Sequence, residues 1–97
     1  MYIFGTEKLK ESTKKNPIEL EYYKTCSNKN GLINESYEVY GVEIIKKEFI
    51  GNKINTESVC VENITRNETT LDKIMSILKN NSVTPVGLRD VINDLLY

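Results

Sequence analysis

The chain has 97 residues, of which 39% are hydrophobic and 28% are charged, so it is long enough for one folded domain with one core. Its formal net charge is −1, so no overall field attracts it to nucleic acid or to an anionic membrane. No stretch approaches the roughly 20 apolar residues of a membrane span, and the first residues lack the basic region of a secretory signal, so we expect a cytoplasmic protein.

The first sixteen residues are polar and only weakly patterned. They hold Lys8, Lys10, Lys14 and Lys15 against two glutamates, which gives this segment a net charge of +2. We expect residues 1–16 to form a solvated arm, with docking of residues 1–4 as a short edge strand or a hydrophobic plug as the alternative. A single domain is expected over residues 17–97.

Residues 17–26 alternate between apolar and polar side chains, which predicts a half-buried strand. One face of this strand carries Ile18, Leu20 and Tyr22, and the other face carries Glu19, Glu21 and Tyr23. Pro17 is tolerated because the first residue of a strand need not donate a hydrogen bond to its neighbour. The polar cluster over residues 27–31 then predicts a turn.

Two further β-rich segments, residues 36–50 and 54–65, flank Gly51-Asn52, a pair that suits a two-residue primed hairpin turn. Such a turn places Ile50 opposite Lys53 and thereby fixes the register of the whole hairpin. The pairs that follow are Val42 with Val61, Ile44 with Val59, and Lys46 with Glu57. Apolar residues meet apolar residues and opposite charges meet, which stabilises cross-strand pairing. The sequence therefore predicts a three-stranded antiparallel meander.

Two amphipathic helices are predicted in the last third of the chain. Residues 65–68, Thr-Arg-Asn-Glu, match a capping box, and Thr84-Pro85 match the N-cap and first residue of a second helix. The apolar stripes that follow are Leu71, Ile74, Met75 and Leu78 in the first helix, and Leu88, Val91, Ile92, Leu95 and Leu96 in the second. Because neither helix is long enough to persist alone, we expect both to pack on one face of the meander in an α+β fold.

The residue types that support catalysis are mostly missing from the sequence. There is no histidine, the commonest general base and metal ligand, and there is no glycine-rich phosphate loop or EF-hand spacing. Cys26 and Cys60 are expected to be free thiols, and Cys60 is expected to be packed and unreactive in a central or near-central strand. We therefore expect no catalytic residues, no metal, no cofactor and no enzymatic activity.

The predicted helix pair also invites a DNA-binding hypothesis, because it resembles a helix-turn-helix in outline. The charged residues from Pro85 to Tyr97 are Arg89, Asp90 and Asp94, a net charge of −1, which a DNA duplex would repel. A DNA-associated accessory protein that uses this pair and the lysine-rich arm is therefore kept as the second hypothesis, with nucleic acid disfavoured as a partner.

Three sequence strings give the chain a likeness to known proteins. They are Glu19-Leu-Glu-Tyr-Tyr-Lys24, Tyr37-Glu-Val-Tyr-Gly-Val-Glu-Ile-Ile-Lys-Lys-Glu48 and Val83-Thr-Pro-Val-Gly-Leu-Arg-Asp-Val-Ile-Asn-Asp-Leu-Leu96. Over residues 18–97 the chain resembles a clostridial family of small uncharacterised proteins, a domain of unknown function. The resemblance implies a fold, but it carries over no activity and no catalytic residue.

These observations favour a small interaction or regulatory protein that binds another protein through its surface. Two candidate surfaces follow from the predicted fold. One is the outer sheet face with Tyr23, Ile45 and Phe49, and the other is the exposed flank of the last helix with Arg89, Asp90 and Asp94. A homodimer through a sheet edge is the alternative partnership, because an edge strand can pair with its own copy.

Overall fold

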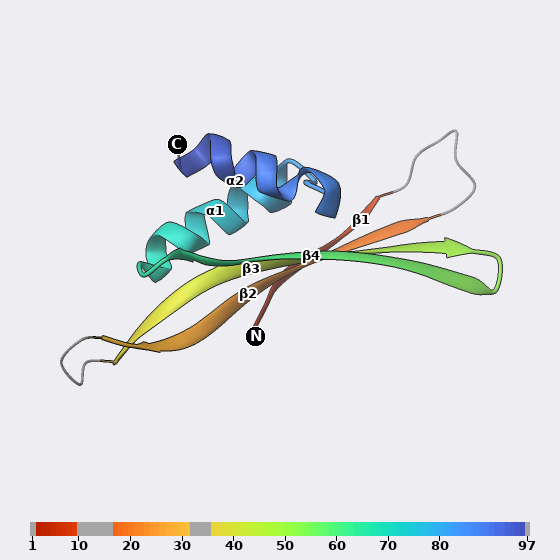
Figure 1. Cartoon of the computed structure of the whole chain (residues 1–97). Helices are drawn as coiled ribbons and strands as arrows, with labels where there is room; N and C mark the ends of the chain where they lie inside the picture. The colour runs from red at the N-terminus through yellow and green to blue at the C-terminus, as the bar shows by residue number, and fades with distance from the viewer. Residues whose placement is uncertain (1, 10–16, 32–35, 97) are drawn as a thin grey trace.

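The computed structural model describes residues 2–9, 17–31 and 36–96, and the described residues form four strands and a helical layer. The strands are β1 (Tyr2–Leu9), β2 (Ile18–Asn30), β3 (Ser36–Ile50) and β4 (Lys53–Thr65). The helices are α1 (Glu68–Asn80), the 3-10 turn η1 (Pro85–Gly87) and α2 (Leu88–Leu96). Figure 1 shows α1 and α2 together on one side of the twisted sheet. We call this side of the sheet the inner face and the opposite side the outer face.

The sheet is antiparallel throughout, with the strand order β1-β2-β3-β4. The predicted meander of β2, β3 and β4 followed by two helices on the sheet is therefore confirmed. β1 adds a fourth strand beside β2, formed by part of the segment expected to be an arm; residues 10–16 of that segment lie outside the described residues. The side chain of Lys79 in α1 lies over β1, since a Cβ atom added to Gly5 would stand 2.7 Å from its Nζ atom.

The register of the β3–β4 hairpin is the predicted one. Ile50 faces Lys53, and Val42, Ile44 and Lys46 face Val61, Val59 and Glu57. Gly51 has φ 59°, and it occupies the first central position of the turn, which a type II′ turn assigns to glycine. A short turn and matching side chains together therefore determine how β3 and β4 pair.

A bulge in β4 interrupts this register at one place. Tyr40 pairs with Thr65, whereas Val42 pairs with Val61, so β4 has extra residues opposite Gly41, and Asn63 among them has φ 58°. The backbones approach closely there. A Cβ atom on Gly41 would lie 2.5 Å from the Val61 carbonyl oxygen, a contact that only glycine avoids.

The core lies between the inner face and the helices. It combines alternate residues of β2 and β3 with the inward stripes of α1 and α2, as the sequence predicted. Its most deeply buried members, each with no measurable exposure, are Leu20, Tyr22, Val42, Ile44, Leu71, Met75, Leu78 and Leu88. The Tyr22 hydroxyl donates a hydrogen bond of 3.0 Å to the Val83 carbonyl, so this ring also ties the sheet to the connection between the helices.

The first predicted helix cap is wrong. The second is confirmed in position, with Thr84 as the N-cap and Pro85 as the first residue of η1, but without a side-chain bond. Thr65 remains paired in the sheet, and its hydroxyl accepts a hydrogen bond of 3.1 Å from the amide of Asn67. Asn67 is the N-cap of α1 instead, and its side chain accepts a bond of 3.1 Å from Thr70 N–H. Thr84 makes no side-chain cap; its carbonyl accepts from Gly87 N–H at 3.1 Å, so Pro85 opens a 3-10 turn before α2 begins.

Candidate interaction surface

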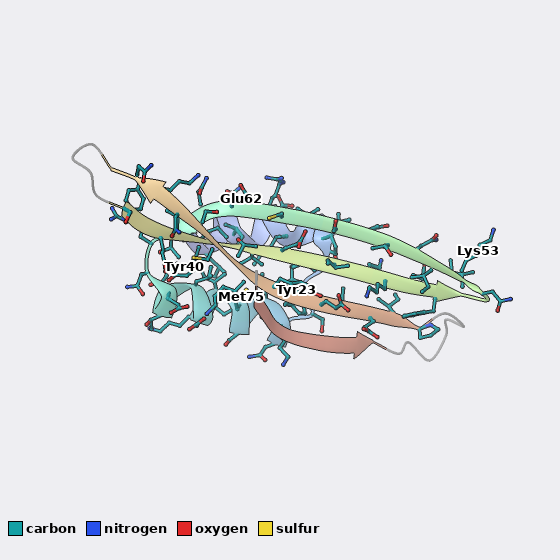
Figure 2. The ribbon with its side chains drawn as sticks, turned by 90° about the horizontal axis from the view of Figure 1, so that it is seen from below. Tyr23, Tyr40, Lys53, Glu62 and Met75 are labelled. Atoms are coloured by element: carbon teal, nitrogen blue, oxygen red, sulfur yellow. The ribbon has the colours of Figure 1, made fainter. Side chains whose placement is uncertain are left out.

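The outer face of the sheet is the side that α1 and α2 leave uncovered in the described part of the chain. Figure 2 views the molecule from this side, with Tyr23 on the strand in front and the helices behind the sheet. The pairing of β2 with β3 sets Tyr23 beside Glu43, Glu21 beside Ile45, and Glu19 beside Lys47. Aromatic, aliphatic and charged side chains are therefore interleaved across the middle of this face.

A short polar network fixes the central part of the outer face. The Tyr23 hydroxyl donates a hydrogen bond of 2.8 Å to Glu21 Oε1, and Lys47 Nζ lies 3.1 Å from Glu21 Oε2. Burial acts to raise the pKa of Glu21, but the hydrogen bonds from Tyr23 and Lys47 and the charge of Lys47 outweigh it, so this pKa is lowered. The same bond to Glu21, together with burial, raises the pKa of Tyr23. The hydrogen bond to Glu21, two residues earlier in β2, thus fixes the Tyr23 side chain along the direction of its own strand.

Ile45 and Phe49 share this face with Tyr23, as the alternation along β3 predicted. All three side chains are half-buried rather than fully exposed. Phe49 lies opposite Ile54 of β4, and its amide donates a hydrogen bond of 3.0 Å to the Pro17 carbonyl. The first predicted surface is therefore a single face built from neighbouring strands.

The second predicted surface lies elsewhere on the molecule. Arg89, Asp90 and Asp94 are all exposed on α2, which packs against the inner face, so they do not join Tyr23, Ile45 and Phe49. These three charges leave α2 with the net negative charge that the sequence indicated. The Lys8 side chain and the other lysines of the arm lie outside the described side chains.

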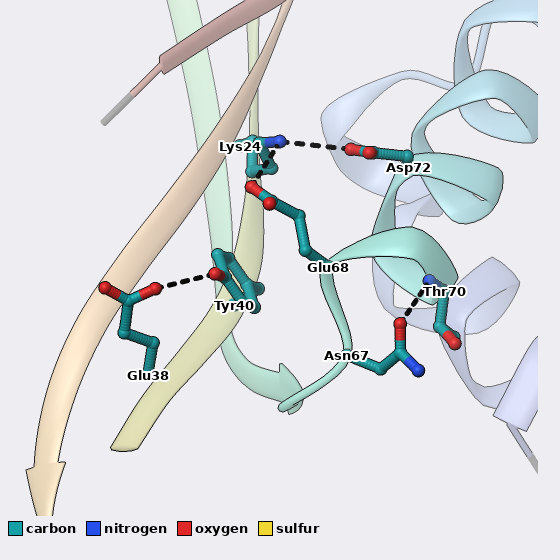
Figure 3. A network of polar contacts seen from close by, with 7 residues as sticks. All are labelled: Lys24, Glu38, Tyr40, Asn67, Glu68, Thr70 and Asp72. Atoms are coloured by element: carbon teal, nitrogen blue, oxygen red, sulfur yellow. Dashed lines mark hydrogen bonds and ion pairs between the residues drawn. The ribbon is translucent and has the colours of Figure 1, made fainter. Parts of the chain in front are cut away.

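On the helix side, a polar network that the sequence analysis missed joins β2 to α1 (Figure 3). Lys24 Nζ lies 2.9 Å from Glu68 Oε2 and 3.1 Å from Asp72 Oδ1. Nearby on β3, the Tyr40 hydroxyl donates a bond of 2.7 Å to Glu38 Oε2. The only sequence signal for the ion pairs is the i, i+4 spacing of Glu68 and Asp72 on one side of the helix.

Lys24, Tyr40 and Cys26 on this side of the sheet keep their protons at neutral pH. The hydrogen bond to Glu68 raises the pKa of Lys24, and the bond to Glu38 raises the pKa of Tyr40. Burial and the charge of Glu38 raise the pKa of the Cys26 thiol. None of the three groups therefore has the lowered pKa that a nucleophile or a general base needs near pH 7.

The two cysteines are free and lie on opposite faces of the sheet. Cys26 pairs with Tyr40 and packs against the core, whereas Cys60 pairs with Glu43 on the outer face. Cys60 lies in β4 and not in a central or near-central strand, because β4 is the last strand of the meander and pairs only with β3 among the described strands. Burial, with Glu43 and Glu62, raises the pKa of the Cys60 thiol.

Other features of the described residues offer no further site. No group of three or more acidic or cysteine side chains among them is arranged to hold a metal ion. A hollow on the hairpin is lined by polar side chains, without the apolar walls of a typical ligand pocket. These side chains are Lys46, Glu48, Asn55, Thr56 and Glu57. Within the same residues, no helix has the length and apolar character needed to cross a membrane.

Comparison with known protein families gives a match over the whole chain. Residues 1–97 match the Family of unknown function (DUF6514), and the chain belongs to this family. No curated protein and no solved structure shows significant similarity to the chain. The family therefore defines the domain and leaves its role to be inferred from the molecule.

Proposed function

We propose that this member of the DUF6514 family is a non-enzymatic interaction or regulatory module that binds another protein through the outer face of its sheet. The observation that carries the proposal is that Tyr23, Ile45 and Phe49 lie along one face of the sheet, which no described helix covers. Large apolar and aromatic side chains on one open face are typical of a docking surface.

The rigidity of this face supports binding over a purely structural role. Glu21, whose side chain is only 12% exposed, accepts from both Tyr23 and Lys47 and holds them in place before any partner arrives. A surface that is already ordered loses less side-chain entropy on association, so more of its contact energy becomes affinity.

The charges around the apolar residues indicate the chemistry of the partner. The outer-face positions of β2 and β3 beside Tyr23 and Ile45 carry three acidic side chains and one basic side chain. They are Glu19, Glu21, Glu43 and Lys47. A complementary partner presents apolar side chains flanked by lysine or arginine, and its association rate falls as salt rises.

The non-enzymatic part of the proposal is supported by the chemistry of the titratable groups. The described thiols, the Tyr23 and Tyr40 hydroxyls and the Lys24 amine all have pKa values shifted toward their protonated forms. A binding surface explains the arrangement of residues without requiring any of these groups to react.

The test uses site-specific photo-crosslinking in the producing cell. A benzoylphenylalanine placed at Phe49 is expected to capture one protein, while the same residue at Val86, which is 83% exposed on the helical side, is not. Ile45→Glu should abolish the Phe49 adduct, and Lys73→Glu, an exposed change on α1, should leave it intact. Adducts that are equal at both positions, or that survive Ile45→Glu, would refute the proposal.

A further inference from the structure

The open half of strand β4 is the feature of the molecule that the proposed function does not use. β4 forms one margin of the four-stranded sheet, and residues 51–58 around its start are all exposed. Figure 1 shows that this part of the hairpin extends past the helices, and Figure 2 shows Lys53 near its tip. Ile54 is 57% exposed there, which is unusual for a large aliphatic side chain on an edge strand.

The two halves of β4 differ in how their edge is protected. The second half contains the bulge with Asn63 and lies beneath the helical layer, where η1 and α2 contact β4. The first half, from Lys53 to Cys60, contains no proline and no register shift. An edge without these protective features exposes a row of backbone donors and acceptors to any strand that can pair with it.

The turn determines which backbone groups in this half are available. Ile50 and Lys53 close a two-residue hairpin and form a hydrogen-bonded pair, so the odd-numbered residues of β4 direct their N–H and C=O groups toward β3. The even-numbered residues Ile54, Thr56 and Ser58 direct theirs outward. A second strand that meets this edge must therefore bond to the even-numbered positions.

We propose that the segment Lys53–Glu57 of β4 pairs antiparallel with the same segment of a second copy, centred on Asn55. Two copies related by a two-fold axis perpendicular to the sheet keep their inner faces on the same side. Residues that pair across the axis must then belong to the same face, so odd-numbered residues pair with odd-numbered ones and even-numbered residues with even-numbered ones. Centring on Asn55 places Lys53 opposite the partner's Glu57 and Ile54 opposite the partner's Thr56. The result is a continuous eight-stranded sheet in which two β4 strands meet.

Charge and burial select this register over its neighbours. It forms two reciprocal Lys53–Glu57 pairs, and each Glu57 already faces Lys46 of its own chain. A centre at Thr56 would set Lys53 against Val59, and a centre at Glu57 would oppose two like charges. In the chosen register Ile54, which has Phe49 on one side, gains the partner's Thr56 on the other.

A charge-exchange experiment tests the pairing directly, with molar mass measured by light scattering over a concentration series. The wild-type chain is expected to show twice the monomer mass at high concentration. Lys53→Glu and Glu57→Lys should each raise the dissociation concentration at least tenfold, because each variant opposes like charges twice. An equimolar mixture of the two variants should dimerise again, since both cross-strand pairs then have opposite signs.

A matched control separates this effect from a change in overall charge. Lys73→Glu makes the same change as Lys53→Glu at an exposed position of α1, and it should dimerise like wild type. Circular dichroism of each variant verifies that it is folded. A wild-type chain that stays monomeric, or a mixture that fails to dimerise although both variants are folded, would overturn the proposal.

A disulfide measurement tests the register independently. In a Cys26→Ala, Cys60→Ser background, Asn55→Cys places two thiols at a directly opposed, non-hydrogen-bonded pair, where the Cα atoms are about 4.5 Å apart and a disulfide can form. Ser58→Cys lies opposite the partner's Asn52 and should remain unlinked. Linking of Ser58→Cys as fast as Asn55→Cys, or of neither, would overturn the register. These outcomes are independent of whether the outer face binds another protein.

Discussion

Strand β3 presents the same residue type to two different environments at adjacent positions. Ile44 has no measurable exposure beneath the helices, whereas Ile45 is half-buried on the outer face. The difference arises because both helices pack on one side, where α1 contacts all four strands. The inner face therefore provides most of the stability, and the outer face has large side chains whose contacts within the chain are incomplete.

The largest expected difference between the faces comes from shortening these two isoleucines. Ile44→Ala should lower the free energy of unfolding by about 3 kcal/mol, because it leaves a cavity in a closely packed core. Ile45→Ala should lower it by about 1 kcal/mol, because part of its surface is already hydrated. Urea unfolding of both variants measures the difference, and equal losses would contradict the distinction between the faces.

A second comparison concerns two glycines, one in the sheet and one in the helical layer. Gly41→Ala should lower the free energy of unfolding by about 2 kcal/mol, because its methyl group meets the Val61 carbonyl and the Glu62 Cα atom at the bulge. Gly87→Ala should be neutral or stabilising by up to about 1 kcal/mol, since the nearest atom, Val83 Cγ1, is 4.0 Å away. Thermal unfolding of both variants measures these effects. If Gly41→Ala proved as stable as wild type, the bulge would have to relax to accommodate the methyl group, and the predicted difference would be wrong.

Two neighbouring tyrosines sharpen the comparison further. Tyr22→Phe removes the hydroxyl that bonds the Val83 carbonyl under the helices and should lower the free energy of unfolding by about 1 kcal/mol. Tyr23→Phe removes a bond to Glu21 on the open face, where water can replace the donor, and should have about half that effect. Urea midpoints measured side by side decide the order, and the reverse order would contradict it.

The smallest effect is a pH dependence on the outer face. The folded-state pKa of Glu21 lies below its ordinary value of 4.5, so its contribution to stability is present above pH 4.5 and is lost as the pH falls through the folded-state pKa. Glu21→Gln should therefore be less stable than wild type at neutral pH and should lose this difference in acid. A difference that persisted unchanged at pH 3 would show that the contribution is not that of the carboxylate.

The sequence predicted the hairpin and the two faces because local and cross-strand signals agreed there. Gly51-Asn52 set the turn, and the pairs Val42–Val61 and Lys46–Glu57 matched in character, so only one register satisfied both. Alternation in β2 likewise separated Tyr22 from Tyr23. These features depend on periodicity, which a single sequence displays directly.

Other features depend on tertiary contacts and could not be inferred in this way. Segment Tyr2–Leu9 lacks a clear alternating pattern, and it becomes a strand because β2 has a free edge. The cap of α1 moved from Thr65 to Asn67 because β4 retains Thr65 as the partner of Tyr40. The ion pairs of Lys24 join residues 44 and 48 positions apart, a separation that no local pattern reveals.

The candidate surface was predictable in its membership but not in its organisation. Alternation assigned Tyr23, Ile45 and Phe49 to one face, whereas the role of Glu21 in holding Tyr23 and Lys47 required the register of β2 against β3. The charges of α2 were also predictable, but their separation from the outer face depended on which side of the sheet the helices occupy.

The most direct test of the account is the unfolding free energy of Ile45→Glu, measured beside Ile44→Glu in urea. We expect Ile45→Glu to remain folded and within about 2 kcal/mol of wild type, because the new carboxylate can reach water on the outer face, although it lies opposite Glu21. Ile44→Glu should fail to fold, because it places an unpaired charge beneath the helices. If Ile45→Glu unfolds the protein as completely as Ile44→Glu, the outer face is not open, and the proposed binding surface does not exist.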